Sequence, residues 1–267
     1  MGTDWVEVGD RCWVRRYSPW DVSSGVVAGD DGLLVIDTRA DVAQGRELAV
    51  HVRALSSLPV LAVMNTHAHF DHLGGNAAFP GCPVVAHAAV PLALERGAPE
   101  PEAPLSTEEK VPPDTVFAHR WDLDLGGREV QATHLGRGHT DGDAVLLVPD
   151  ADVVYAGDLV EQSGPPSFGP DCWPLEWGPT LERLASMLDP VTNVVPGHGD
   201  VVDVDFVAQQ ARDVTQVAEH LRLLVAAHVP EADALSRGPW PFPVEGLAVA
   251  VHRGYRHLGA GHAGHPG

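Results

Sequence analysis

Long hydrophobic runs are missing from this sequence. No apolar stretch approaches the roughly 20 residues that a membrane-spanning helix needs. The first 13 residues have neither the basic start nor the apolar core of a secretory signal. We therefore expect a soluble, cytoplasmic protein that does not bind membranes.

Positive charge is also scarce. The chain has 17 Lys and Arg residues against 37 Asp and Glu residues, which gives a formal net charge of −20, and Lys110 is its one lysine. Such a field repels phosphate backbones and anionic membrane surfaces. We expect a small-molecule substrate and no nucleic-acid partner, while the oligomeric state stays open.

Cysteine is rare as well. Cys12, Cys82 and Cys172 are odd in number and far apart in the sequence, so they form neither a CxxC pair nor a disulfide framework. The sequence also has no Gly-x-Ser-x-Gly motif, which argues against a serine nucleophile of that type. Histidine, by contrast, is abundant at 15 residues.

The pattern of apolar residues predicts alternating groups of strands and helices. The expected fold class is α/β (α+β). We expect two β-rich halves, each covered by helices on one face. We predict one domain over residues 1–267, with a core at about 11–226, a helical extension from 227 and a glycine-rich tail expected to be disordered. The expected strands are 12–17, 25–28, 33–36, 60–64, 83–86, 117–123, 130–135, 145–148, 153–156 and 194–195; the expected helices are 42–55, 88–96, 178–188 and 203–228; and 99–113 is an exposed connection.

A cluster of metal-ligand residue types directly follows the predicted strand at 60–64. His67 and His69 alternate, so an extended backbone places them on the same side. Asp71 and His72 follow where the chain turns ahead of two glycines. Imidazole and carboxylate ligands suit zinc, iron or manganese better than calcium, which requires oxygen.

Three later residues can complete two metal sites. His139 lies between two predicted strands, Asp158 follows the strand at 153–156, and His198 follows the strand at 194–195. Each stands beside glycine at the end of a strand, where a rigid scaffold presents ligands on loops.

With these motifs the chain resembles the metallo-β-lactamase superfamily over roughly residues 11–226. The matching segments are Asn65-Thr66-His67-Ala68-His69-Phe70-Asp71-His72-Leu73-Gly74-Gly75-Asn76, Gly138-His139-Thr140, Gly157-Asp158 and Pro196-Gly197-His198-Gly199, with Asp37 after the strand at 33–36.

The resemblance implies an αββα sandwich of two β-sheets flanked by helices, with metals at one edge. It also implies the roles of the candidate residues. His67, His69 and His139 would bind a first metal; Asp71, His72 and His198 a second; Asp158 would bridge them; and Asp37 would hold a ligand histidine by a hydrogen bond.

The expected chemistry follows from metal-activated water. Zinc can lower the pKa of water from about 15.7 to about 7, so hydroxide is available at neutral pH. Asp71 is the candidate catalytic residue, since it can orient the hydroxide and then carry its proton. The sequence therefore predicts a hydrolase of a small ester, lactone, thioester or amide, with two Zn²⁺ per chain, and iron or manganese as open alternatives for the metal.

Other functions stay open at this point. β-Lactamase branches tend to place Cys or Ser where this chain has Asp158, so the sequence looks more like glyoxalase II or lactonase-type members, with β-lactamase as a further alternative. A persulfide-dioxygenase-like oxidoreductase would use one iron at His67, His139 and Asp158. A metal-binding protein without catalytic activity is the third hypothesis.

One segment invites a hypothesis about the substrate. Residues 161–177 follow Asp158 and are rich in Pro, Gly and aromatic residues. Phe168, Trp173 and Trp177 are proposed to wall a substrate pocket. The remaining histidines, His134 included, are not expected to bind metal.

Overall fold

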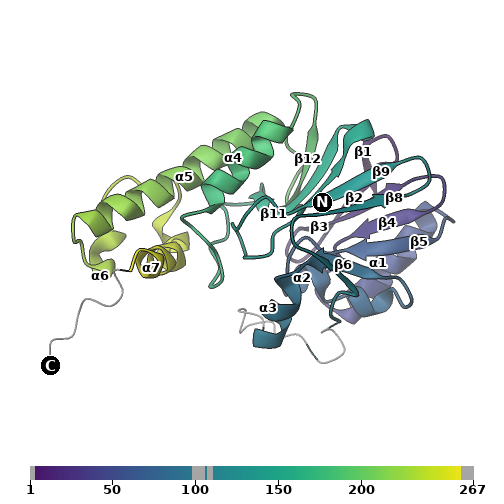
Figure 1. The fold of residues 1–267 in the computed structure, drawn as a ribbon, viewed down its shortest axis with the longest axis horizontal. Coiled ribbons are helices and arrows are strands. Elements are labelled where there is room, and N and C mark those ends of the chain that lie inside the picture. Colours follow the sequence, from purple (N-terminus) through teal and green to yellow (C-terminus); the bar gives the residue numbers. More distant parts are fainter. Residues whose placement is uncertain (1–3, 98–105, 107–110, 260–267) are drawn as a thin grey trace.

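Two groups of strands and their covering helices make up the computed structural model, which describes residues 4–97, 106 and 111–259 (Figure 1). The strands are β1 Val6–Gly9, β2 Cys12–Tyr17, β3 Val22–Ala28, β4 Leu33–Ile36, β5 Val60–Met64, β6 Val84–His87, β7 Thr115–Phe117, β8 Arg120–Asp124, β9 Glu129–Thr133, β10 Val145–Val148, β11 Val153–Glu161 and β12 Asn193–His198. The helices are α1 Val42–Leu55, α2 Phe70–Leu73, α3 Val90–Arg96, α4 Trp177–Met187, α5 Val204–Ala226, α6 Glu231–Ala234 and α7 Ala248–His257, with short 3₁₀ turns at Asn76–Ala78, Pro149–Ala151 and Val244–Gly246.

The strands follow one hydrogen-bonded path, in the order β7-β6-β5-β4-β3-β12-β11-β10-β9-β8, with β2 and then β1 added beside β3. Strands β1 to β7 form the first half and β8 to β12 the second. The link between the halves is narrow, because β12 pairs with β3 only at His198 and Val22. The two halves can therefore fold over each other as facing sheets.

Alternating side chains in the first half point to two different layers. Val35 and Val63 pack with Leu48 of α1 on the outer face. Leu34 and Met64, the residues next to Val35 and Val63 along the strands, enter the core between the halves. This period of two is what a strand buried on both faces requires.

The second half repeats this arrangement with other helices. Tyr155 of β11 lies in the core between the halves, whereas Val154 packs outward against Leu181 of α4 and Val214 of α5. The layers are thus α1, first sheet, second sheet, then α4 and α5. This confirms the αββα sandwich of the α/β class.

The two long helices begin where the sequence offers a capping aspartate. Asp41 accepts a hydrogen bond from the backbone N–H of Gln44 at 2.7 Å, and Asp203 accepts one from Phe206 at 2.9 Å. Each carboxylate satisfies a donor that the first helical turn leaves free. The predicted helix limits agree with α1 and differ from α5 by two residues or fewer.

The strand predicted at 117–123 is wrong, because it is two strands. β7 ends at Phe117, where it pairs with β6 of the first half, and β8 starts at Arg120, where it pairs with β9 of the second. The chain crosses between the sheets at this point. The intervening Ala118 carbonyl accepts a hydrogen bond from His87 instead of joining a strand.

The predicted strand at 153–156 is too short, since β11 continues to Glu161 and contains Asp158. Gly157 has a φ of +53°, and the register with β12 shifts on both sides of it. A bulge of this kind bends a strand without ending it, and glycine adopts a positive φ without strain. β12 likewise extends through His198 instead of ending at 195.

After residue 226, where the sequence predicts a helical extension, the structure has α6 and α7. Leu247, Ala250 and Tyr255 join the same core as Leu221 of α5. The glycine-rich tail, from residue 260, and most of the connection predicted at 99–113 lie outside the described residues. In the part of the chain that the structure describes, no helix has the length and apolar character to cross a membrane.

Candidate metal centre

The histidine-rich segment leaves β5 and turns into α2. His67 lies in the bend between β5 and α2, His69 is the N-cap of α2, and Asp71 and His72 lie within its single turn. Asn65 fixes this turn, because its side-chain amide donates a hydrogen bond to the carbonyl of His72 at 3.1 Å. All four candidate ligands are buried.

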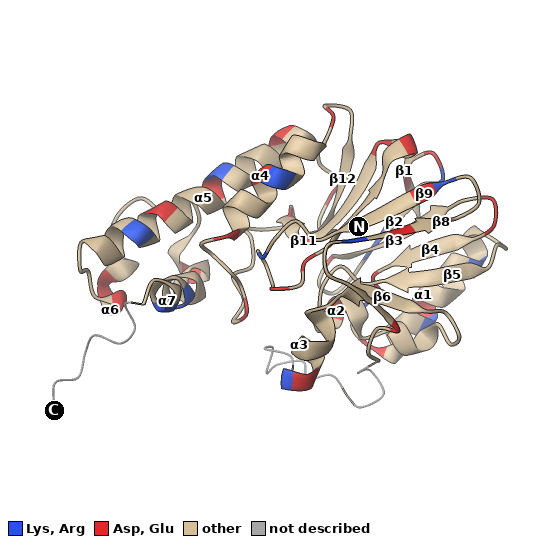
Figure 2. Cartoon of the chain, in the orientation of Figure 1, with Lys and Arg blue, Asp and Glu red and all other residues tan. Residues whose placement is uncertain are grey.

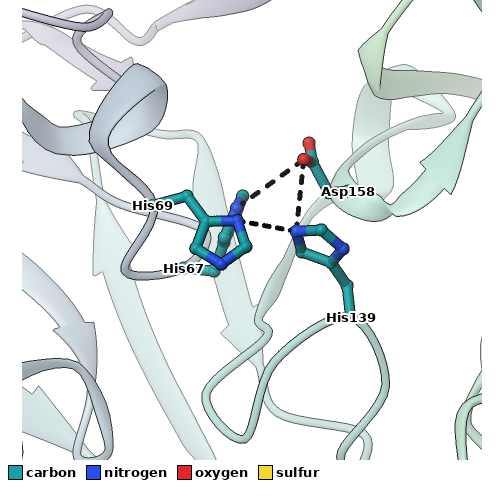
Figure 3. A group of neighbouring side chains, drawn as sticks. All are labelled: His67, His69, His139 and Asp158. Atoms are coloured by element: carbon teal, nitrogen blue, oxygen red, sulfur yellow. Dashed lines mark hydrogen bonds and ion pairs between the residues drawn. The ribbon is translucent and has the colours of Figure 1, made fainter. Parts of the chain in front are cut away.

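The structure brings all seven predicted ligands together in two adjacent groups. His67, His69, His139 and Asp158 form the first group, and Asp71, His72 and His198 form the second. Within each group the ligand atoms lie within 4.8 Å of one another. Figure 3 shows the first group converging from opposite sides, with two histidines on the β5–α2 segment and the others on the second half.

Asp158 lies between the two groups. Its Oδ2 is 3.4 Å from Nε2 of His139 in the first group and 3.3 Å from Nε2 of His198 in the second. Its Oδ1 is 3.1 Å from Nε2 of His72. This is the placement that a carboxylate bridging two ions requires.

In the second group, each histidine donates its outward ring N–H to a protein acceptor. His72 Nδ1 lies 2.7 Å from Oδ2 of Asp37. His198 Nδ1 lies 2.8 Å from the carbonyl of Trp20, in the loop between β2 and β3. The hydrogen bond expected of Asp37 is therefore present, and both Nε2 atoms are left facing inward.

His67 is fixed through a two-step chain. The Thr66 hydroxyl donates to Asp37 at 2.8 Å, so it accepts from Nδ1 of His67 at 3.0 Å. Asp37 also accepts the backbone N–H of Thr66 at 2.8 Å. One buried carboxylate thus orients a histidine in each group.

The other two histidines of the first group are held by the loop after β11. His139 Nδ1 lies 3.0 Å from the carbonyl of Ser167, and His69 Nε2 lies 3.2 Å from Oδ2 of Asp171. Their inward atoms, Nε2 of His139 and Nδ1 of His69, are 2.8 Å apart. Such outer hydrogen bonds select the tautomer that leaves the inner nitrogen free to bind a metal.

The donor set fits transition-metal ions. Nε2 of His67 is buried with no hydrogen-bond partner among the described residues, and it lies 3.7 Å from Oδ2 of Asp158. A buried polar atom left unsatisfied costs about 1–3 kcal/mol, so this inward imidazole nitrogen beside a carboxylate indicates a missing ligand. Five imidazoles with two carboxylates are typical of zinc, iron or manganese sites.

Burial dominates the electrostatics of the first group. It lowers the pKa of His67 well below its ordinary value and lowers the pKa of His139 to about 4. Neighbouring histidines lower both further, against the opposing charge of Asp158. These imidazoles are therefore neutral at pH 7, which is the form that binds metal.

Carboxylates dominate the second group. Burial acts to lower the pKa values of His72 and His198, but the charge of Asp158, with help from Asp71, outweighs it. The pKa of His72 is raised well above its ordinary value, and that of His198 is raised to about 11. In the metal-free protein these histidines hold protons that a metal ion must displace.

Sequence reasoning missed Asp171 and Glu161. Asp171 contacts His69 from 102 residues away, and no local motif marks it within its Pro-rich loop. The buried Glu161 accepts the backbone N–H of Ser167 at 3.1 Å and so supports the carbonyl that holds His139. The one available signal was that both lie in the segment 161–177 already singled out.

The aromatic residues of that segment divide into two kinds. Phe168 and Trp177 are buried in the hydrophobic core, where Trp177 packs 5.6 Å from the His139 ring and donates to the carbonyl of Leu159. Trp173 borders a cleft. The pocket-wall hypothesis is therefore kept for Trp173 and corrected for the other two, which are too deeply buried to line an open pocket.

The histidines expected not to bind metal join neither ligand group in the described part of the chain. His134 donates from Nδ1 to the carbonyl of Asp143 at 2.7 Å and stacks on His87 with ring centroids 4.0 Å apart.

Comparison of the chain with known protein families identifies the family to which it belongs. The family model described as the metallo-beta-lactamase superfamily matches residues 17–200. The chain belongs to this superfamily. The match contains all seven candidate ligands and Asp37, and it ends before α5, α6 and α7.

Several relatives with named activities are similar to this chain. A metallo-beta-lactamase type 2 of Bacillus sp. (strain 170) is 29% identical over 187 residues, which is 68% of each chain. The human acyl-coenzyme A thioesterase MBLAC2 is 30% identical over 214 residues, 72% of this chain and 74% of the relative. A solved metallo-beta-lactamase from Pontibacter korlensis shares the fold, with a TM-score of 0.66, 23% identity, and coverage of 78% of this chain and 98% of that one. Membership and the ligand groups together support a metal-dependent hydrolase in general.

Proposed function

We propose that this chain is a hydrolase with two zinc ions per chain that acts on a small ester, lactone, thioester or amide. One observation carries the proposal above all: two complete ligand groups share Asp158, and each of their five histidines donates its outward nitrogen to a protein acceptor. Such preorganisation is typical of a centre built for two ions.

The ions, when bound, would supply a water of lowered pKa and positive charge to stabilise an oxyanion. Asp71 is proposed to accept a hydrogen bond from the attacking water and then carry its proton to the leaving group. Its Oδ2 lies 3.3 Å from Nε2 of His198, the one member of the second group that is only partly buried. In the metal-free protein the positive charge of His72 and His198 keeps the pKa of Asp71 low against burial.

The proposed substrates combine the chemistry of the site with that of its relatives. The named relatives act on amide and thioester compounds, and one 24% identical relative is a linear primary-alkylsulfatase from Pseudomonas sp.. All three are hydrolytic activities, in which water attacks an electrophilic centre. We favour small acyl compounds, with β-lactams as one member of the screen.

A substrate screen with metal-reconstituted protein tests this proposal. The panel contains aryl esters, lactones, thioesters and β-lactams, each assayed with the wild type and with Asp71→Asn. We expect hydrolysis by the wild type and a fall in kcat of roughly 10²-fold or more in the variant, as for loss of a general base. Equal activity of the two proteins would mean that this centre is not the source.

Metal analysis separates the proposal from an iron oxygenase. His67, His139 and Asp158 alone form a two-His-one-carboxylate set that suits iron. The complete second group favours two ions instead. About two zinc per chain supports the hydrolase, whereas one iron per chain with oxygen uptake would overturn it. Full zinc loading with no hydrolysis of any panel member would favour metal binding without catalysis.

A further inference from the structure

A cleft of about 400 Å³ opens beside the first ligand group. Arg96 at the end of α3 borders it on one side, Arg253 and His257 of α7 on the other, and Asp171 and Trp173 between them. Asp171 connects the cleft to the centre, because its carboxylate accepts the hydrogen bond from Nε2 of His69. The α7 wall lies outside the residues that the family model matches.

Arg253 is held rigidly at this cleft. Its Nε donates to the carbonyl of Cys172 at 2.7 Å, and its Nη2 donates to the carbonyl of Asp171 at 3.3 Å. Both acceptors are neutral, and no described carboxylate forms an ion pair with this guanidinium. No described ion pair therefore offsets the charge of Arg253, and its Nη1 makes no hydrogen bond within the described residues.

The other charges around the cleft are already matched. Arg137, which stacks on Trp173 at 3.6 Å, forms two hydrogen bonds with Glu176. Arg96 lies 3.7 Å from Asp141. Figure 2 shows basic residues, in blue, on α7 and at the end of α3. Of the arginines that line this cleft, Arg253 has no carboxylate partner among the described residues.

His257 adds a second polar group beside Arg253. Its ring stacks on Trp173, with centroids 4.6 Å apart and planes 17° apart. Burial and the charge of Arg253 lower its pKa, so the imidazole is neutral at pH 7 and has N–H to donate. A guanidinium with a neighbouring N–H donor is a suitable pair for the two oxygens of a carboxylate.

We propose that this cleft binds a free carboxylate of the substrate, with Arg253 as its main partner and His257 as a second donor. The inference rests on the proposed function and narrows its substrates to acyl compounds that carry a carboxylate away from the bond to be cleaved. A monoanion is favoured over a phosphate dianion, because Asp141 and Asp171 in the same walls repel a second negative charge.

Matched substrates provide the first test. The metal-loaded enzyme is assayed on pairs of esters that differ only in a carboxylate or its neutral carboxamide. We expect Arg253→Met to raise KM for the carboxylate ester by about tenfold or more, the usual loss for a charge-assisted contact, with kcat/KM for the carboxamide ester within about twofold of the wild type. An equal loss on both esters would overturn the inference.

Two further variants separate recognition from structure. Arg256→Met removes the same charge from an exposed position on α7 and should leave both esters unchanged. His257→Phe keeps a ring against Trp173 while removing both nitrogens, and should raise KM severalfold for the carboxylate ester alone. If His257→Phe and Arg253→Met both leave that KM unchanged, the carboxylate is bound elsewhere.

Binding without turnover distinguishes failure of the inference from failure of the proposed function. Benzoate, benzamide and phenyl phosphate are titrated into the metal-loaded wild type, Arg253→Met and Arg256→Met by calorimetry. Weaker benzoate binding in Arg253→Met alone supports the cleft even if no panel substrate is hydrolysed. A larger effect of that variant on phenyl phosphate than on benzoate would overturn the carboxylate assignment.

Discussion

The two ligand groups are neighbours that share Asp158 and yet have opposite electrostatics. In the first, burial keeps His67 and His139 neutral. In the second, carboxylates keep His72 and His198 protonated in the metal-free protein. Similar ligand types thus give one group that is ready to bind an ion at neutral pH and one that must first release protons.

Removing the shared ligand should have the largest effect. Asp158→Ala takes a carboxylate from both groups and removes the negative charge that lies beside four inward nitrogens. We expect both ions to bind more weakly and kcat/KM to fall by about 10³-fold or more, the scale for loss of electrostatic stabilisation at a reacting centre. Metal content after dialysis and steady-state kinetics measure the two effects. Retention of two ions with near wild-type kinetics would mean that Asp158 bridges nothing.

The pH dependence of metal content distinguishes the groups directly. His198, with a pKa raised to about 11, is protonated throughout the neutral range, so affinity of the second group should fall about tenfold for each unit of pH and each proton displaced. His139, with a pKa of about 4, is neutral above pH 5, so the first group should change little.

Equilibrium dialysis against limiting zinc between pH 5.5 and 8.5 measures this difference. We expect about two ions per chain at high pH and about one at low pH. His198→Ala provides the matched control and should hold about one ion throughout. Parallel loss of both ions from the wild type as pH falls would contradict the assigned difference between the groups.

The carboxylates behind the ligands should act mainly on different groups, and unequally, because Asp37 contacts His72 directly and reaches His67 only through Thr66. Asp37 accepts three hydrogen bonds, so Asp37→Asn leaves an amide N–H facing a donor and favours the His72 tautomer that cannot bind metal. We expect about 10–100-fold weaker binding of the second ion. Asp171 is needed only as an acceptor for His69, which an amide oxygen can replace.

Asp171→Asn should therefore weaken binding of the first ion by less than about tenfold. Competition with a chromophoric chelator resolves the two affinities in each variant. The comparison fails if Asp171→Asn has the larger effect, or if both variants weaken the same ion.

Some features of the fold and of the metal centre could be predicted from the sequence alone. The apolar run at Val60–Met64 and the periodicity of α1 gave correct limits, because their burial is set by local pattern. The seven candidate ligands could be selected because strand ends and glycines mark them. All seven converge in the structure.

What sequence could not supply depends on contacts between distant segments. Strand β11 continues through Gly157 because β12 pairs with it on both sides of the bulge, which no local signal reports. Asp171 and Ser167 act on histidines only because the loop after β11 folds back over them. The electrostatic difference between the groups also depends on burial in the folded protein.

Substitution of Glu161 should have the smallest effect on metal binding by the two ligand groups. Its effect on stability should nevertheless report the charge of the centre. The Glu161 carboxyl is buried 3.9 Å from Nδ1 of His139, and burial together with the charge of Asp158 raises its pKa to about 8. A raised carboxyl pKa means that its stability contribution is full below the unfolded value of about 4.5 and is lost as pH rises through 8.

Glu161→Gln mimics the neutral form and keeps an acceptor for Ser167, so metal content at pH 7 should stay unchanged. In the metal-free protein, unfolding at pH 5 should be similar for the two chains, whereas at pH 9 the variant should be more stable by a few kcal/mol. Bound ions offset the charge of Asp158, so the difference at pH 9 should shrink when both groups are loaded. A difference that is the same with and without zinc would show that Glu161 does not sense the charge of the centre.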